Sequence, residues 1–323
     1  MRPGMRNKVN HQQSMDGILN LNKPKGWTSH DVVARVRHLT RVRRVGHAGT
    51  LDPMATGVLL VCLGRATRIT EYLMTGRKRY RAVASLGIST DSHDADGTVT
   101  ATAPITVSCA EVEAALSHFR GPIEQVPPMV SAIKQHGQPL YKLARRGITV
   151  ERAARRVEIY ELNLAQCPLP TDPLPNADTS YDLTLELTCS SGTYVRALAR
   201  DLGECLGCGA HLTALTRLAS GDFSLDQAIG MEQLTQAVTN DDWRHLLLPI
   251  DAGLKHLPAC TLGKKESRQV QSGRPLPAAL ITQPTDQLCR AYAAHDAEKK
   301  LLALLKFDEN AQLWRPHKVF QPL

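Results

Sequence analysis

The sequence predicts an α+β fold. Its clearest element is a strict alternation of apolar and polar residues over 181–189, which is typical of a strand with one buried and one solvent-facing side. Apolar residues then recur at helical spacing over 195–206, which indicates an amphipathic helix. Because strands and helices follow one another without a repeating βαβ rhythm, α+β is favoured over a doubly wound parallel sheet.

The first expected elements surround a glycine-rich segment. A short strand over 17–21 leads into a turn, and Ser29 is placed to cap the helix that follows. One face of that helix is apolar and carries Val32, Val33, Val36 and Leu39. The apolar run 58–63, bounded by glycines, predicts a buried strand, and 80–86 predicts another.

Turn and loop signals mark the later segments. An acidic turn occupies 91–97, and Gly207 and Gly209 suit the end of the amphipathic helix. The segments 121–156 and 166–180 are interrupted by several prolines, which indicates irregular surface excursions.

Length and composition bound the organisation of the chain. At 323 residues it is long enough for two domains, and 42% hydrophobic and 22% charged residues are typical of a globular protein. We expect a disordered tail over 1–15, a main domain over 16–250 with an insertion over 121–156, and a small module over 251–323. The last boundary depends on a shift in composition near 249–258.

The chain is basic, with a formal charge of +8 and a sequence pI near 9.1. This excess suits a nucleic acid, because phosphate contacts dominate nucleic-acid affinity, although many basic proteins bind none. Clustering favours the nucleic-acid interpretation. Two short stretches are rich in arginine, the first with Arg35, Arg37, Arg41, Arg43 and Arg44, the second with Arg145, Arg146, Arg152, Arg155 and Arg156.

The eight cysteines are scattered through apolar patterns, which predicts reduced thiols in the cytoplasm rather than a disulfide framework. No apolar run approaches the roughly 20 residues of a membrane-spanning helix, so no membrane partner is expected. Cys205, Cys208 and His211 could suggest zinc, but a second ligand pair at suitable spacing is missing. We therefore expect no metal.

Four ordered motifs carry a resemblance to a known family. The stretch 46–57, Gly-His-Ala-Gly-Thr-Leu-Asp-Pro-Met-Ala-Thr-Gly, is preceded by Lys-Pro-Lys-Gly at 23–26. Lys-Arg-Tyr follows at 78–80, and Ser-Gly-Thr-Tyr-Val-Arg at 191–196. Together they resemble the signature of the TruB family of pseudouridine synthases over roughly residues 16–250. The resemblance implies a pseudouridine synthase fold, a mixed and largely antiparallel sheet with flanking helices, and a small C-terminal β module similar to a PUA domain.

The loop around Asp52 is unusual in composition. Three glycines and a proline within 46–57 indicate special backbone angles or close approach to a ligand. A carboxylate in such a loop, just after a basic segment, is well placed for the sugar of an anionic substrate. An Asp-Pro turn without chemistry is the alternative, and the other three motifs favour the catalytic interpretation.

The resemblance implies a tRNA pseudouridine-55 synthase. This isomerase breaks the N-glycosidic bond of a T-loop uridine, turns the base and rejoins it through carbon, so no cofactor is expected. The base has to leave its stack first. Asp52 would be the nucleophile, on the sugar or on the uracil ring, and has to be ionised at neutral pH. Arg196 corresponds to the arginine beside it in the family and is expected to lower its pKa.

Further site residues follow from the same resemblance. His47 would enter the T-loop near the space that the flipped base leaves. Tyr80 would stack on the uracil and serve in proton transfer, Tyr194 and Leu215 would line the pocket, and Lys23 would contact the substrate. The simpler interpretation is an ordinary loop residue for His47 and an ordinary core residue for Tyr80, Tyr194 and Leu215.

Residues 121–156 resemble the family's thumb, an insertion that orders on RNA. Its basic residues Lys134, Lys142, Arg145 and Arg146 would contact phosphates, unless they form a solvated basic face. The expected partner is the T-arm of tRNA, bound by a monomer without an obligatory protein partner. Asp94, in the acidic turn, is either an orienting group for the site or a solvated turn residue.

Two other functions stay open. A guide-RNA-dependent pseudouridine synthase would share the catalytic core, but the thumb-like insertion and the lack of a long lysine-rich tail favour a standalone enzyme. A non-catalytic protein that binds or folds tRNA would leave the four motifs without a purpose.

Overall fold

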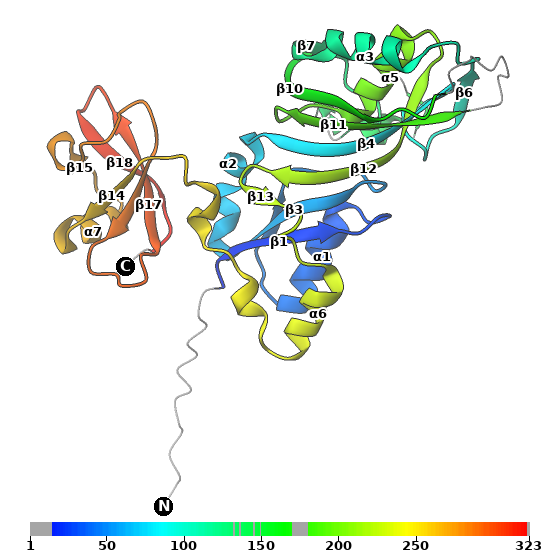
Figure 1. The fold of residues 1–323 in the computed structure, drawn as a ribbon. Coiled ribbons are helices and arrows are strands. Elements are labelled where there is room, and N and C mark those ends of the chain that lie inside the picture. Colours follow the sequence, from blue (N-terminus) through cyan, green and yellow to red (C-terminus); the bar gives the residue numbers. More distant parts are fainter. Residues whose placement is uncertain are drawn as a thin grey trace, which may run out of the picture.

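The fold is mixed and built around two sheets, as the α+β prediction requires (Figure 1). The computed structural model describes residues 15–131, 133–135, 137–144, 146–148, 150–169 and 180–321. Of the tail expected over 1–15, all but Met15 lies outside these residues. Within the part of the chain that is described, none of the helices combines the length and hydropathy needed to span a bilayer.

The larger sheet has nine strands. They are β1 (Gly17–Lys23), β2 (Val45–Ala48), β3 (Thr56–Leu63), β4 (Lys78–Leu86), β7 (Gly121–Gln125), β10 (Arg155–Gln166), β11 (Tyr181–Cys189), β12 (Ala210–Ser220) and β13 (Phe223–Ser224). The strand order is β1-β3-β12-β4-β11-β10-β7, with β2 on β3 and β13 on β12. Only the β3–β12 pairing among these is parallel, so the described sheet is mixed and largely antiparallel.

Helices cover this sheet, and two short strand pairs form small sheets of their own. The helices are α1 (Ser29–Thr40), α2 (Thr70–Thr75), α3 (Cys109–Leu116), α4 (Leu140–Ala144), α5 (Val195–Cys205) and α6 (Met231–Thr239), with 3-10 turns η1 (Gly64–Ile69), η2 (Ser117–Phe119), η3 (Trp243–Leu246) and η4 (Ile250–Gly253). Two hairpins add β5 (Ile88–Thr90) with β6 (Val99–Thr102), and β8 (Lys134–Gln135) with β9 (Gln138–Pro139). Figure 1 shows α3 and α5 over the β10–β11 end of the sheet, and α1 and α6 beside β1.

The strand and helix predicted most clearly are confirmed. In β11 the alternate residues Leu183, Leu185 and Leu187 are buried, and in α5 Leu198 and Leu202 join them in one apolar cluster. Full burial of such a side chain contributes about 1.5–3 kcal/mol. The glycines after α5 have positive φ angles, as the stop signal requires.

Helix α1 is present as predicted, but its cap is Thr28 and not Ser29, so the helix begins one residue earlier than expected. Thr28 accepts a hydrogen bond from the Asp31 amide, and the Asp31 carboxylate accepts one from the Thr28 amide. Ser29 is the first helical residue and is buried. Threonine and serine both cap helices well. Here Thr28 is the cap, because the Ser29 hydroxyl bonds the Leu51 backbone instead.

The smaller sheet, near the C-terminus, has five strands in the order β14-β16-β17-β18-β15. Its elements are β14 (Ala259–Leu262), α7 (Lys264–Gln271), β15 (Leu276–Pro277), η5 (Ala278–Leu280), β16 (Cys289–Ala293), β17 (Leu301–Asp308) and β18 (Leu313–Val319). Phe320, just after β18, is buried in an apolar cluster with Ile69 and Leu73. The guanidinium groups of Arg65 and Arg68 donate to carbonyl oxygens of Phe320 and Val319. The C-terminal strand is thereby fixed against η1 and α2.

One prediction about the cysteines is wrong. Cys109, at the start of α3, and Cys167, just after β10, form a disulfide with a Cα–Cα distance of 5.9 Å. The two residues are 58 positions apart, and only the packing of α3 beside β10 brings them together. The other six cysteines are free thiols.

Candidate active site

Five of the residues expected in the site line one cleft of about 560 Å³: Asp52, Tyr80, Tyr194, Arg196 and Leu215. Asp52 lies in the loop between β2 and β3, Tyr80 on β4, the next two at the start of α5, and Leu215 on β12. Neighbouring strands and the helix beside them thus bring together residues from four distant parts of the chain.

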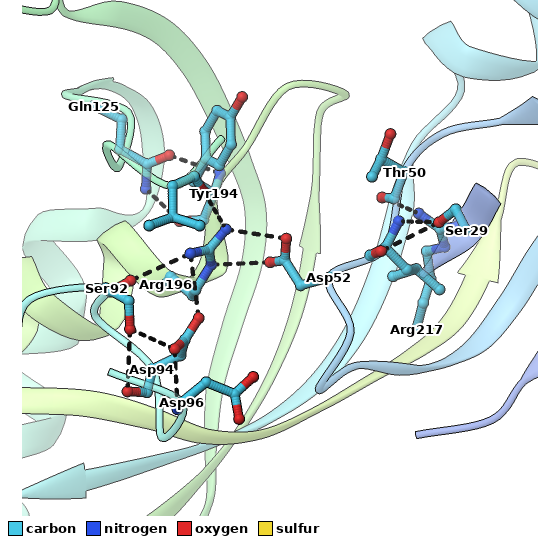
Figure 2. Close-up of polar contacts among 12 residues, drawn as sticks. Ser29, Thr50, Asp52, Ser92, Asp94, Asp96, Gln125, Tyr194, Arg196 and Arg217 are labelled. Carbon is cyan, nitrogen blue, oxygen red and sulfur yellow. Dashed lines mark hydrogen bonds and ion pairs between the residues drawn. The ribbon is translucent and has the colours of Figure 1, made fainter. Parts of the chain in front are cut away.

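Asp52 and Arg196 form a two-pronged ion pair (Figure 2). The Arg196 Nε lies 2.9 Å from Oδ2 of Asp52, and Nη2 lies 3.0 Å from Oδ1. The arginine side chain is 3% exposed, whereas the aspartate side chain is 34% exposed. The guanidinium therefore fixes the orientation of a carboxylate that still reaches the cleft.

The remaining donors of Arg196 are also bound. Nη1 lies 3.2 Å from Oδ2 of Asp94 and donates to the Ser92 carbonyl oxygen, while Nη2 donates to the Val130 carbonyl oxygen at 2.7 Å. Asp94 is buried, and its Oδ1 accepts hydrogen bonds from the Ser92 hydroxyl and the Asp96 amide (Figure 2). Asp94 is therefore not a solvated turn residue, because it holds the arginine from the side opposite Asp52.

The pKa of Asp52 is raised, contrary to the expectation from Arg196 alone. Burial raises it because the charged form loses water, while the Arg196 guanidinium opposes the shift. The charge of Asp94 raises the pKa further. The physical reason for the difference is that loss of water around Asp52 outweighs the attraction of a guanidinium that is shared with a second carboxylate.

The loop that carries Asp52 is held from the side of α1. The Ser29 hydroxyl accepts from the Leu51 amide at 2.9 Å and donates to the Leu51 carbonyl oxygen at 3.2 Å. The Lys23 ammonium donates to three carbonyl oxygens, those of Pro24, Trp27 and Pro53. Lys23 is fully buried and is not among the cleft-lining residues, and its hydrogen bonds hold the turn and the loop together.

Arg217 holds the same loop from β12, and the sequence did not single it out. Its side chain is 1% exposed and donates to the carbonyl oxygens of Val58, Gly49 and Thr50. It also bonds the Tyr80 side chain. A Cβ on Gly57 would meet the Arg217 carbonyl oxygen at 2.2 Å, which explains a glycine at this position. The available signal was a charged residue at a buried position of a strand.

Two tyrosines line the cleft. Burial raises the pKa of Tyr80 and of Tyr194, so both phenols are protonated at neutral pH. The backbone of Tyr194 is fixed by Gln125, whose side-chain oxygen accepts from its amide and whose nitrogen donates to its carbonyl oxygen. Leu215 is 7% exposed and adds an apolar wall.

The other predicted residues lie outside the cleft lining. His47 is on β2, with its ring edge-on to that of His30 at 5.2 Å, and burial lowers its pKa to about 4. Lys142 and Arg146 are exposed, and the Lys134 backbone belongs to β8. Arg145 lies outside the described residues. Among the residues that are described, no group of three or more His, Cys, Asp or Glu side chains is placed to hold a metal.

Comparison with known proteins gives the same assignment along most of the chain. Residues 37–195 match the family model of the TruB family pseudouridylate synthase N-terminal domain, and residues 196–255 match that of the tRNA pseudouridylate synthase B C-terminal domain. A relative named tRNA pseudouridine synthase B, from Thiobacillus denitrificans, is 44% identical over 284 residues, 88% of this chain and 90% of its own. Another of that name, from Geobacillus thermodenitrificans, is 42% identical over 305 residues, 90% and 99% of the two chains.

The fold also resembles solved structures. A chain in the crystal structure of a Cbf5-Nop10-Gar1 complex has a TM-score of 0.70 at 26% identity, over 95% of this chain and 85% of that one. The chain therefore belongs to the TruB family of pseudouridine synthases.

Proposed function

We propose that this chain is a tRNA pseudouridine synthase that isomerises uridine 55 in the T-loop, with Asp52 as the nucleophile. The observation that carries the proposal is the carboxylate of Asp52 at the floor of a cleft, held side-on by the buried Arg196. The names of the relatives supply tRNA as the substrate.

The reaction conserves all atoms. The bond between N1 of uracil and C1′ of ribose breaks, a bond between C5 and C1′ forms, C5 loses a proton and N1 gains one. Arg196 binds both oxygens of Asp52 from one side, which leaves lone pairs on the cleft side for attack on the sugar or the ring. Because Nη1 and Nη2 of Arg196 are already held by hydrogen bonds, the ion pair orients the carboxylate before the substrate arrives.

The aromatic residues provide the base site. Tyr80 is the stacking surface for the flipped uracil, and its protonated phenol is available for proton transfer. Tyr194 and Leu215 enclose the base from other sides. His47 is neutral at physiological pH and lies on β2, at the base of the catalytic loop, where it would enter the T-loop as the base leaves.

RNA binding outside the cleft is assigned to two segments. Residues 121–156 act as a thumb whose Lys134, Lys142, Arg145 and Arg146 contact phosphates. The module over 251–323 acts as a PUA-like RNA-binding domain beside the catalytic domain over 16–250. The enzyme works as a cytoplasmic monomer without a protein partner.

The direct test uses purified protein and an unmodified tRNA transcript, without guide RNA. We expect pseudouridine at position 55 and nowhere else in the T-arm. Asp52→Asn should reduce the rate by at least about 10³-fold and leave tRNA affinity unchanged, because the amide is the same size but is not a nucleophile. Product only after addition of a guide RNA would instead support the guide-dependent function, which the likeness to the Cbf5 complex makes worth testing. No product under either condition would support a tRNA-binding protein.

A further inference from the structure

Lys78 is a buried cation in the cleft that the proposed reaction does not use. It is the first residue of β4, two positions before Tyr80, so both side chains lie on the same face of the strand. Its side chain is 5% exposed and lines the same cleft. The two side chains are one strand pleat apart, a step of about 7 Å.

The ammonium of Lys78 has fewer hydrogen-bond acceptors around it than it has protons to donate. Among the described residues it has a single acceptor, the Leu73 carbonyl oxygen at 3.2 Å, although an ammonium has three protons to donate. No described carboxylate forms an ion pair with it. Glu71, which lines the same cleft, is bound to Lys318 instead. Burial and the nearby charge of Arg217 lower the Lys78 pKa to about 8, so an anion beside the ammonium would stabilise its charged form.

The surroundings of Lys78 suit an anion. The turn 190–193 and the first residues of α5 line the cleft, and among the described residues no side chain caps this helix. Its first amides therefore have no side-chain acceptor, and a helix N-terminus favours a negative group. In the target nucleotide uracil is neutral, and the negative charge is on the phosphodiester. The ribose separates that phosphodiester from the base, much as one pleat of β4 separates Lys78 from Tyr80.

We propose that Lys78 binds a phosphodiester of the flipped nucleotide and so fixes the sugar over Asp52. The assignment rests on the proposed function for the identity of the substrate. It makes Lys78 a substrate-binding residue of the cleft, one that acts on the backbone of the target nucleotide and not on its base.

The first test compares three variants by tRNA affinity and by single-turnover rate. Lys78→Met keeps the length of the side chain and removes the charge, and we expect roughly tenfold to a hundredfold weaker binding. Lys78→Arg keeps a charge and should recover most of it. Arg79→Met is the matched control, because Arg79 is the next residue and is exposed on the other face of β4. Equal losses for Lys78→Met and Arg79→Met would overturn the proposal.

The second test changes the RNA, so its first comparison uses the wild-type protein alone. A single uncharged methylphosphonate linkage is placed on the 5′ or the 3′ side of the target uridine. Wild-type protein should bind one of the two RNAs as weakly as Lys78→Met binds normal tRNA, and the variant should lose nothing further with that RNA. Wild-type affinity that neither linkage changes, or losses that multiply in the variant, would overturn the proposal. Affinity is measured without turnover. A protein that makes no pseudouridine would therefore contradict the proposed function, while the affinities would still show whether Lys78 binds the phosphodiester.

Discussion

The cleft and the segment 126–148 both carry basic side chains, but those of the cleft are buried and bonded whereas those of the segment are exposed. On the floor, Arg196 and Arg217 are almost fully buried, and their donors meet carboxylates or carbonyl oxygens. In the segment, Lys142 and Arg146 are exposed, and no ion pair to another described residue holds them. Chemistry requires groups fixed in advance, whereas attraction of a polyanion requires only charge within a Debye length.

The largest effect within this comparison is expected for Arg217→Met. The change leaves the carbonyl oxygens of Gly49, Thr50 and Val58 without their donor, so the Asp52 loop should shift. We expect a rate loss of at least about 100-fold and a loss in unfolding free energy of about 3 kcal/mol or more. Single-turnover kinetics and denaturant unfolding measure the two effects. A variant with wild-type stability and rate would show that the position of the Asp52 loop does not depend on the hydrogen bonds of Arg217.

A smaller effect is expected for Asp94→Asn, which weakens the hold on Arg196 from behind. Loss of such a supporting group should reduce the rate about 10- to 100-fold.

The pH profile distinguishes this variant from a merely unstable one. In the wild type the rate should fall as Asp52 takes up a proton, at a pH above the ordinary aspartate pKa of about 3.9, because burial raises the pKa. Removing the negative charge of Asp94 removes one cause of the raised value, so the acid limb should move to lower pH. An acid limb at unchanged or higher pH would contradict this account of the Asp52–Arg196–Asp94 cluster.

The smallest effect is expected for substitutions in the segment 126–148. Lys142→Ala combined with Arg146→Ala should weaken tRNA binding several-fold and leave the rate at saturating tRNA unchanged, because neither side chain touches the cleft lining. The slope of log affinity against log salt should fall by about 1.5 if both side chains contact phosphates. A changed rate at saturation would mean that this segment also shapes the active site.

The sequence predicted best what short-range patterns encode. The alternation in β11, the amphipathic face of α5 and the buried run in β3 each follow from neighbours within a few residues. The convergence of Asp52, Tyr80, Tyr194 and Arg196 had no such pattern behind it. It was predicted from four ordered motifs and their resemblance to one family.

What escaped prediction depends on non-local pairing. Arg217 reaches the Asp52 loop only because β12 lies between β3 and β4, which places residues about 160 positions apart in contact. The Cys109–Cys167 disulfide depends in the same way on the packing of α3 beside β10. The burial of Lys23 was missed because a lysine in a turn is normally exposed, and three carbonyl oxygens converge on this one.

The attachment of β18 to α2 has a practical consequence for handling the enzyme. Met74 and Thr75 of α2 line the cleft, and Lys318 and Phe320 hold that helix and the turn before it. A reporter protein, surface tether or affinity tag joined just after β18 would pull on α2, and α2 forms part of the wall of the active-site cleft. The C-terminal strand is therefore an unsuitable attachment point, even though it is far in sequence from every residue of the proposed chemistry.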